Sequence, residues 1–179
     1  MLITILVVDD SASDRLIIKN MLSEYCILTA CDGVEAIRVL EEHDGINLLI
    51  LDLNMPNMNG FQVLEHLRED ERYRKLRTII LSNFDELDNE IKGLKLGAVD
   101  YVRKPIHMES LKARIDVHVA LLRTQEALEQ QLHHQSANFE MIFNQAPIGA
   151  AVSYCKDEIA WDSNKHFNIN SAFEKLTGR

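Results

Sequence analysis

The sequence predicts an α/β protein: a five-stranded, doubly wound parallel sheet followed by a long C-terminal helical extension. Five short apolar runs of strand length alternate with stretches in which apolar residues recur at helical spacing. The runs are apolar throughout, which is typical of strands buried on both faces of a parallel sheet. With 179 residues, 46% of them hydrophobic, the chain is long enough to bury such a core.

The predicted strands occupy residues 3–8, 27–30, 47–53, 78–81 and 99–102. The first is the β-branched run ITILVV, which stops at Asp9 and Asp10. The third is NLLILDL, which carries Asp52 near its end and leads into a turn-rich segment that closes at Gly60. Each strand therefore ends at a polar residue or a turn.

Helical periodicity fills the intervals between these strands. Ser11 and Ser13 are candidate N-caps for the first helix, where Leu16 and Ile17 belong to the apolar pattern. Gly97 suits the end of the fourth helix. The last helical stretch follows Pro105 and continues without proline or glycine to about residue 143, so we expect one long helix over 108–143.

The composition excludes several classes of protein. The formal net charge is −9, from 28 acidic and 19 basic residues, which argues against direct binding to nucleic acid. No apolar run is long enough to span a bilayer and no basic signal sequence opens the chain, so we expect a cytoplasmic protein without membrane contact. Three cysteines without a C-x-x-C pair indicate free thiols rather than disulfides or a zinc site.

Polar groups of complementary chemistry follow four of the five predicted strands. They are Asp9 and Asp10, Asp52, Ser82, and Lys104. Because ligands of such sheets bind at the carboxyl ends of the strands, we expect these groups to meet there. Carboxylates gathered in one pocket repel one another, and a bound cation removes that penalty. Oxygen ligands favour Mg²⁺, with Mn²⁺ as an alternative.

This set of side chains suits phosphoryl transfer. A carboxylate held beside a metal can attack phosphorus and form an aspartyl phosphate. Lys104 can neutralise the phosphoryl oxygens opposite the metal, and Ser82 can donate a hydrogen bond to them. Taken singly, each residue is more often a helix cap or a solvated loop residue. Their convergence at one edge favours a common site.

The residues resemble the receiver domain of two-component response regulators, which has a flavodoxin-like fold. The matching stretches are VVDDSASDR, LLILDLNMPNMNGFQVL, IILSN and GAVDYVRKP. The resemblance covers residues 1–122. It implies that Asp52 accepts a phosphoryl group from a histidine kinase or a phosphotransfer protein. It also implies that Asp9, Asp10, Asp52 and the backbone carbonyl of Asn54 bind the metal.

The same resemblance assigns a switch. Ser82 takes the place of the switch hydroxyl, Lys104 that of the phosphate-binding lysine, and Tyr101 that of the switch aromatic residue. Asn83 departs from the family pattern, which commonly has a small residue there, and its bulk can restrict access to the acceptor. A pseudo-receiver that only binds partners is the alternative. Either way, the expected role is a signalling module rather than a metabolic enzyme.

Residues 123–143 are expected to form a linker helix with coiled-coil character. One heptad seam contains Ile115, His118, Leu122, Gln125, Glu129, Leu132, Phe139 and Phe143. A second contains Val117, Leu121, Leu128 and Ile142. Both seams include gaps or polar positions, which is typical of a weak or regulated coiled coil. We therefore expect a homodimer, through this helix or through the face formed by helix four, strand five and helix five.

Residues 144–179 resemble the N-terminal fragment of a PAS sensory domain. The resemblance rests on FEMIFNQAPIGAAVSY and FNINSAFEKLTGR. A fragment of this size can hardly bury a core alone. We therefore expect a longer parent protein whose output is an effector such as a diguanylate cyclase (GGDEF) or a histidine kinase.

Two other families share part of this chemistry. A haloacid-dehalogenase phosphatase places its nucleophile on the first strand in an Asp-x-Asp pattern, whereas this chain has Asp9-Asp10-Ser11 there. A flavodoxin needs a phosphate-binding loop rich in hydroxyl groups and glycine after that strand, where the acids of this chain would repel the phosphate of FMN. The receiver interpretation accounts for more of the residues than either.

Overall fold

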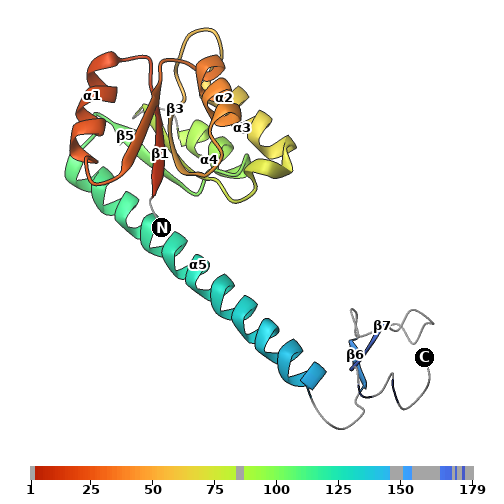
Figure 1. The fold of residues 1–179 in the computed structure, drawn as a ribbon. Helices are drawn as coiled ribbons and strands as arrows, with labels where there is room; N and C mark the ends of the chain where they lie inside the picture. The colour runs from red at the N-terminus through yellow and green to blue at the C-terminus, as the bar shows by residue number, and fades with distance from the viewer. Residues whose placement is uncertain are drawn as a thin grey trace. The chain divides into compact units, whose positions relative to one another are not determined.

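The computed structural model describes residues 3–83, 87–145, 151–154, 166–170, 172 and 175. The chain divides into two compact units, Met1–Arg123 and Thr124–Arg179. The first holds a complete sheet with its helices (Figure 1). The second contains the distal part of the last helix and a strand pair.

The first unit contains the predicted parallel sheet. Its strands are β1 (Thr4–Val8), β2 (Cys26–Ala30), β3 (Ile46–Asp52), β4 (Arg77–Asn83) and β5 (Asp100–Lys104). They lie in the order β2-β1-β3-β4-β5, and all four pairings are parallel. The chain order of strands reverses at β1, which places β1 and β3 side by side in the centre. The predicted fold class is confirmed.

Five α-helices alternate with these strands and continue into the extension. They are α1 (Ala12–Met21), α2 (Gly33–Glu42), α3 (Gly60–Glu69), α4 (Leu87–Lys95) and α5 (Met108–Gln145), with a short 3₁₀ helix, η1, at Glu71–Tyr73. The 3₁₀ turn has no counterpart among the predicted elements. The predicted long helix over 108–143 is α5.

The sheet separates two hydrophobic cores. Helices α2 and α3 pack on one face, against a cluster that includes Leu6, Leu49 and Leu51. Helices α1 and α5 pack on the other face, against Ile50 and Ile79. Figure 1 shows α1 and α2 on opposite sides of the strands. Because both faces are covered, the strands are apolar without alternation, and the polar groups collect at the strand ends.

Local sequence signals begin and end the helices as expected at several positions. The Ser11 side chain accepts from the backbone N–H of Asp14 and caps α1. Gly97, with φ +107°, follows α4 in the left-handed region that glycine enters without strain. The predicted apolar face of α1 is wrong in part. The helix faces the sheet with Ile18 and Leu22, so Leu16 and Ile17 are exposed.

The second unit is described in part. Its strands β6 (Ala151–Tyr154) and β7 (His166–Ile169) pair antiparallel. The side chain of Asn170 donates to the backbone carbonyl of Phe143 over 2.9 Å. Much of the segment that resembles a PAS domain lies outside the described residues. Within the described part of the chain, no helix has both the length and the apolar character needed to cross a bilayer.

Candidate functional site

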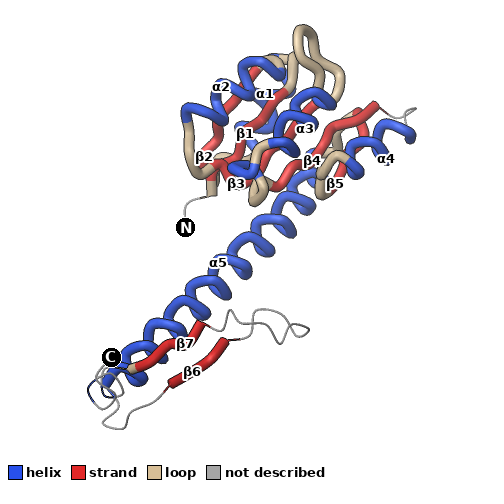
Figure 2. Tube along the Cα trace, turned by 90° about the vertical axis from the view of Figure 1, so that its right-hand side faces the viewer, coloured by secondary structure: helices blue, strands red, loops and turns tan. Residues whose placement is uncertain are grey.

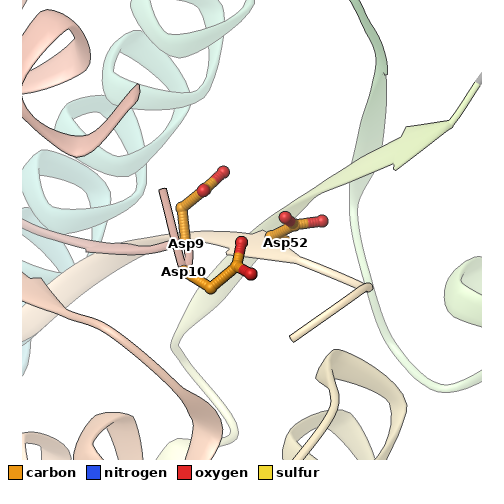
Figure 3. A group of neighbouring side chains, drawn as sticks. All are labelled: Asp9, Asp10 and Asp52. Atoms are coloured by element: carbon orange, nitrogen blue, oxygen red, sulfur yellow. The ribbon is translucent and has the colours of Figure 1, made fainter. Parts of the chain in front are cut away.

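Three carboxylates gather at the carboxyl edge of the two central strands. Asp9 and Asp10 follow β1, and Asp52 is the last residue of β3. Figure 3 shows these side chains around one region of the edge. Oxygen atoms of the three carboxylates lie within 4.8 Å of one another. Asp9 and Asp52 are 0% and 3% exposed, whereas Asp10 is exposed.

Lys104 reaches this cluster from the end of β5. Its Nζ lies 2.6 Å from Oδ2 of Asp52 and 2.9 Å from Oδ2 of Asp9. The other oxygens of these carboxylates accept backbone bonds: Ser11 N–H donates to Asp9 over 2.8 Å, and Asn54 N–H donates to Asp52 over 3.1 Å. Both buried carboxylates are thus held in fixed orientations by backbone and ammonium donors.

The cluster carries more negative than positive charge. Burial raises the pKa of Asp52, and the hydrogen bonds from Lys104 and Asn54 offset that effect only in part. Burial acts to lower the pKa of Lys104, but its hydrogen bonds with Asp52 and Asp9 outweigh burial and raise that pKa. The ammonium is therefore protonated. Lys104 and Arg15, whose guanidinium donates to the backbone carbonyl of Asp9, bring two positive charges to three carboxyl groups.

A divalent cation fits this arrangement. The donors are all oxygen atoms, they lie close enough to share one ion, and they carry excess negative charge. Hard cations such as Mg²⁺ or Mn²⁺ prefer these ligands to nitrogen or sulfur. The residues able to hold the ion are Asp9, Asp10 and Asp52. Asn54 follows within two residues of Asp52, so its backbone carbonyl is the fourth predicted ligand.

The β3–α3 loop is held close behind Asp52. A Cβ atom at Gly60 would meet the backbone carbonyl oxygen of Asp52, and Gly60 N–H donates to the Leu53 carbonyl over 3.1 Å. Asn57, at φ +63°, donates from its side chain to Asp32 over 2.7 Å. These contacts fix the loop that carries Asn54. Sequence reasoning identified the turn but not the need for glycine at position 60.

The remaining predicted residues are placed differently. Ser82, on β4, is buried, and its hydroxyl donates to the Asn83 carbonyl over 3.2 Å. Asn83 is exposed. Tyr101 is half-buried on β5, with the guanidinium of Arg103 lying 5.8 Å from its ring centre. The structure therefore brings the acids and Lys104 together, while the Ser82 hydroxyl is directed to backbone and Tyr101 lies beside Arg103.

A second buried ionic contact lies next to this site and was not predicted from the sequence. Glu90 on α4 is 1% exposed, and Arg103 binds both of its carboxylate oxygens, over 2.6 and 3.0 Å. In the sequence, Glu90 looks like one more acid in an acidic stretch.

A third buried polar cluster joins α5 to the sheet. His118 is buried, and its Nδ1 accepts from Arg77 Nε over 3.3 Å. Its Nε2 lies 3.5 Å from Asp100, which also accepts two bonds from Arg114. Burial and the adjacent Arg77 lower the pKa of His118, against the opposing effect of Asp100. The lowered pKa favours the neutral imidazole at pH 7, with Nε2 facing Asp100.

Known proteins share the first unit of this chain. Residues 5–116 match the family described as response regulator receiver domain. Chemotaxis protein CheY1 of Helicobacter pylori is 37% identical over 116 residues, which are 63% of this chain and 94% of that protein. A probable cyclic di-GMP phosphodiesterase of Vibrio cholerae is 33% identical over 129 residues, which are 72% of this chain but 29% of that protein.

Solved structures agree with the sequence matches. A probable two-component system response regulator/GGDEF domain protein has a TM-score of 0.64 and 31% identity, covering 68% of this chain and 50% of that one. The chain spans less than half the length of several curated relatives, at 45%, 49% and 29% of three of them.

Proposed function

Since this chain belongs to the response regulator receiver domain family, we propose that it accepts a phosphoryl group on Asp52 and acts as a two-component signalling switch. The donor is a histidine kinase or a phosphotransfer protein. The observation that carries the proposal is the contact of Lys104 with both Asp52 and Asp9 at the sheet edge. The arrangement supplies a nucleophile, a fixed cation and an acidic metal site in one place.

The chemistry follows from these positions. An oxygen of Asp52 attacks phosphorus of a phosphohistidine, a P–O bond forms, and the P–N bond breaks so that the imidazole leaves and takes up a proton. Lys104 already lies 2.6 Å from the attacking carboxylate and can move with it to the phosphoryl oxygens. A divalent cation on Asp9, Asp10, Asp52 and the Asn54 carbonyl would add positive charge on the other side.

Switching then uses residues next to the acceptor. The hydroxyl of Ser82 turns from the Asn83 carbonyl to the phosphoryl group, and Tyr101 moves inward. The change favours one arrangement of the face formed by α4, β5 and α5. In this proposal the module catalyses only its own phosphorylation and the hydrolysis of its aspartyl phosphate.

The domain organisation supports an output beyond the receiver. We propose a receiver over 1–122, a linker helix over 123–143 and a PAS-like fragment over 144–179. Two longer relatives, a probable two-component system response regulator/GGDEF domain protein and a probable cyclic di-GMP phosphodiesterase, favour a diguanylate cyclase or a related effector. Output would pass through a dimer formed by the linker helix or by the α4-β5-α5 face.

Intact mass spectrometry after incubation with acetyl phosphate and Mg²⁺ tests the acceptor. We expect a gain of about 80 Da in the wild type, and none in Asp52→Asn or when EDTA removes the metal. Asp44→Asn, which changes an exposed aspartate outside the cluster, is the matched control and should gain the same mass. No gain in the wild type, together with no binding of beryllofluoride, would instead support the pseudo-receiver.

A further inference from the structure

The loop between β1 and α1 carries two of the three clustered carboxylates. Val8 is the last residue of β1 in the sheet, and Asp9 and Asp10 follow it directly. The loop is short, and α1 packs on the adjacent sheet face through Ile18 (Figure 2). The backbone of this loop therefore determines where the two carboxylates point.

The three carboxylates are held to different degrees. Asp9 and Asp52 each accept a backbone N–H and the ammonium of Lys104. Within the described part of the chain, no hydrogen bond or ion pair holds the carboxylate of Asp10, which is exposed. Figure 3 shows this carboxylate turned toward Asp52. The direction of the Asp10 side chain consequently depends on its backbone.

Arg15 binds that backbone from the first turn of α1. Its Nη1 donates to the backbone carbonyl of Asp9 over 2.5 Å. Because a peptide bond is planar, this carbonyl, the N–H of Asp10 and the Cα atom of Asp10 belong to one rigid unit. A hydrogen bond to the Asp9 carbonyl therefore restrains the plane from which the Asp10 side chain leaves the chain.

Arg15 also holds the far end of the same loop. Its backbone N–H donates to the Ser11 carbonyl over 3.1 Å, which is the first hydrogen bond of α1. At the near end, the backbone N–H of Asp9 donates to the Ala30 carbonyl over 3.3 Å. The loop is thus attached at both ends, and the Arg15 side chain secures the peptide between them.

We propose that Arg15 is a positioning residue for Mg²⁺, which orients Asp10 by holding the Asp9 carbonyl. The inference rests on the proposed function and deepens it by adding a residue outside the four predicted ligands. Mg²⁺ requires nearly ideal octahedral geometry, so a misdirected carboxylate weakens its binding. Mutation of a group that orients metal ligands typically lowers metal affinity by about 10- to 100-fold.

The charge of Arg15 would have the opposite effect on the metal. A guanidinium near three carboxylates repels a divalent cation, so its removal would strengthen Mg²⁺ binding if charge alone counted. Loss of the hydrogen bond to Asp9 would weaken Mg²⁺ binding instead. The direction in which the affinity changes therefore separates the positioning role from a purely electrostatic one.

Isothermal titration calorimetry of the full chain with Mg²⁺ measures that direction. We expect Arg15→Gln, whose side chain is shorter and neutral, to bind Mg²⁺ about 10-fold more weakly than the wild type. Arg15→Lys keeps a charged donor and should recover part of the affinity. The matched control is Lys19→Gln, which removes an exposed positive charge from the last turn of the same helix and should not weaken binding.

A second ion makes the measurement specific for geometry. Ca²⁺ accepts more flexible coordination than Mg²⁺, so it tolerates a misdirected ligand better. Arg15→Gln should therefore raise the Kd for Mg²⁺ several-fold more than the Kd for Ca²⁺. Urea unfolding in EDTA verifies that the variants fold. If Arg15→Gln does not fold, the same comparison of the two ions is made on Arg15→Lys.

Three results would overturn the positioning role: tighter Mg²⁺ binding by Arg15→Gln, unchanged Mg²⁺ binding, or an equal loss of affinity for both ions. A wild type that binds neither ion would refute the proposed metal site and the positioning role together. Phosphoryl transfer to Asp52 is measured separately, by the intact mass of the wild type. A wild type that gains the phosphoryl mass, beside an Arg15→Gln variant with unchanged Mg²⁺ affinity, would refute the positioning role and leave the proposed function standing.

Discussion

Arg103 and Lys104 are neighbours on β5, and each meets a buried carboxylate on a different side of the strand. Arg103 binds Glu90 on α4, whereas Lys104 binds Asp9 and Asp52 at the sheet edge. Successive side chains of a strand point in opposite directions, so the two cations serve two separate sites. Their charge balance is what distinguishes them.

The Glu90 contact pairs opposite charges one to one. The Arg103 guanidinium binds the Glu90 carboxylate through two parallel bonds, so these two charges balance each other. At the other site the Lys104 ammonium and the nearby Arg15 guanidinium meet three carboxylates, so negative charge remains for a ligand to neutralise. The balanced Arg103–Glu90 pair holds α4 on the sheet, whereas the excess negative charge at the Lys104 cluster suits the binding of a cation. Counting charges therefore separates the structural contact from the functional one.

The largest effect on stability should come from the balanced pair. Glu90→Gln removes the negative charge that Arg103 binds and places an amide in a site built for a carboxylate. We expect a loss of about 2 kcal/mol in the free energy of unfolding, below the 3–5 kcal/mol typical of fully buried pairs because Arg103 is partly exposed. Urea unfolding measures this loss, with the exposed Glu65→Gln as control. A loss no larger than that of the control would show that the pair contributes little.

The unbalanced site should respond in the opposite direction. Asp52→Asn removes one of the three clustered carboxylates, and Asp9 can still bind Lys104. Without Mg²⁺ we expect the variant to be more stable than the wild type, because burial raises the pKa of Asp52 and so already disfavours its carboxylate form. Thermal or urea unfolding in EDTA would measure it, beside Asp44→Asn. Destabilisation in EDTA would contradict the charge-imbalance argument.

The smallest effect concerns the neutral cluster at His118. Its pKa is lower in the folded chain than in the unfolded one, so the unfolded chain binds the proton first. The corresponding stability is present above the unfolded pKa of about 6.5 and is lost as the pH falls through the folded pKa. His118→Gln should reduce the loss of unfolding free energy between neutral and acidic pH, by less than about 1 kcal/mol. Urea unfolding at a series of pH values measures this, and the exposed His134→Gln should leave the pH dependence unchanged.

The fold could be read from the sequence because its signals are local. Each strand is a continuous apolar run, and each run ends at a turn or a polar residue, so the edge that gathers Asp9, Asp52 and Lys104 follows from topology alone. The hydrogen-bond partner of a polar side chain, and whether that side chain is buried, could not be predicted in this way. The hydroxyl of Ser82 bonds to the neighbouring carbonyl, and Glu90 is buried, because tertiary packing decides both.

Periodicity also had a limit. The two predicted heptad seams of α5 fit the sequence about equally well, and the sequence alone does not say which of their residues are buried. Ile115 and His118 belong to the first predicted heptad seam, but both are buried in the receiver core and so cannot contact a second helix. The apolar pattern of α1 was ambiguous for the same reason, since Leu16 and Ile18 fit different helical faces.

Gly60 illustrates how mutational tolerance can mislead. It has no side chain and donates no group to the site, yet any Cβ atom there would collide with the backbone of the strand that presents Asp52. A saturation screen for signalling should therefore score position 60 as intolerant to every substitution, much like Asp52, the proposed acceptor. The two positions should separate only when folding is measured alongside activity: we expect Asp52→Asn to leave a well-folded, inactive protein, whereas a substitution at Gly60 should displace the loop that carries the site.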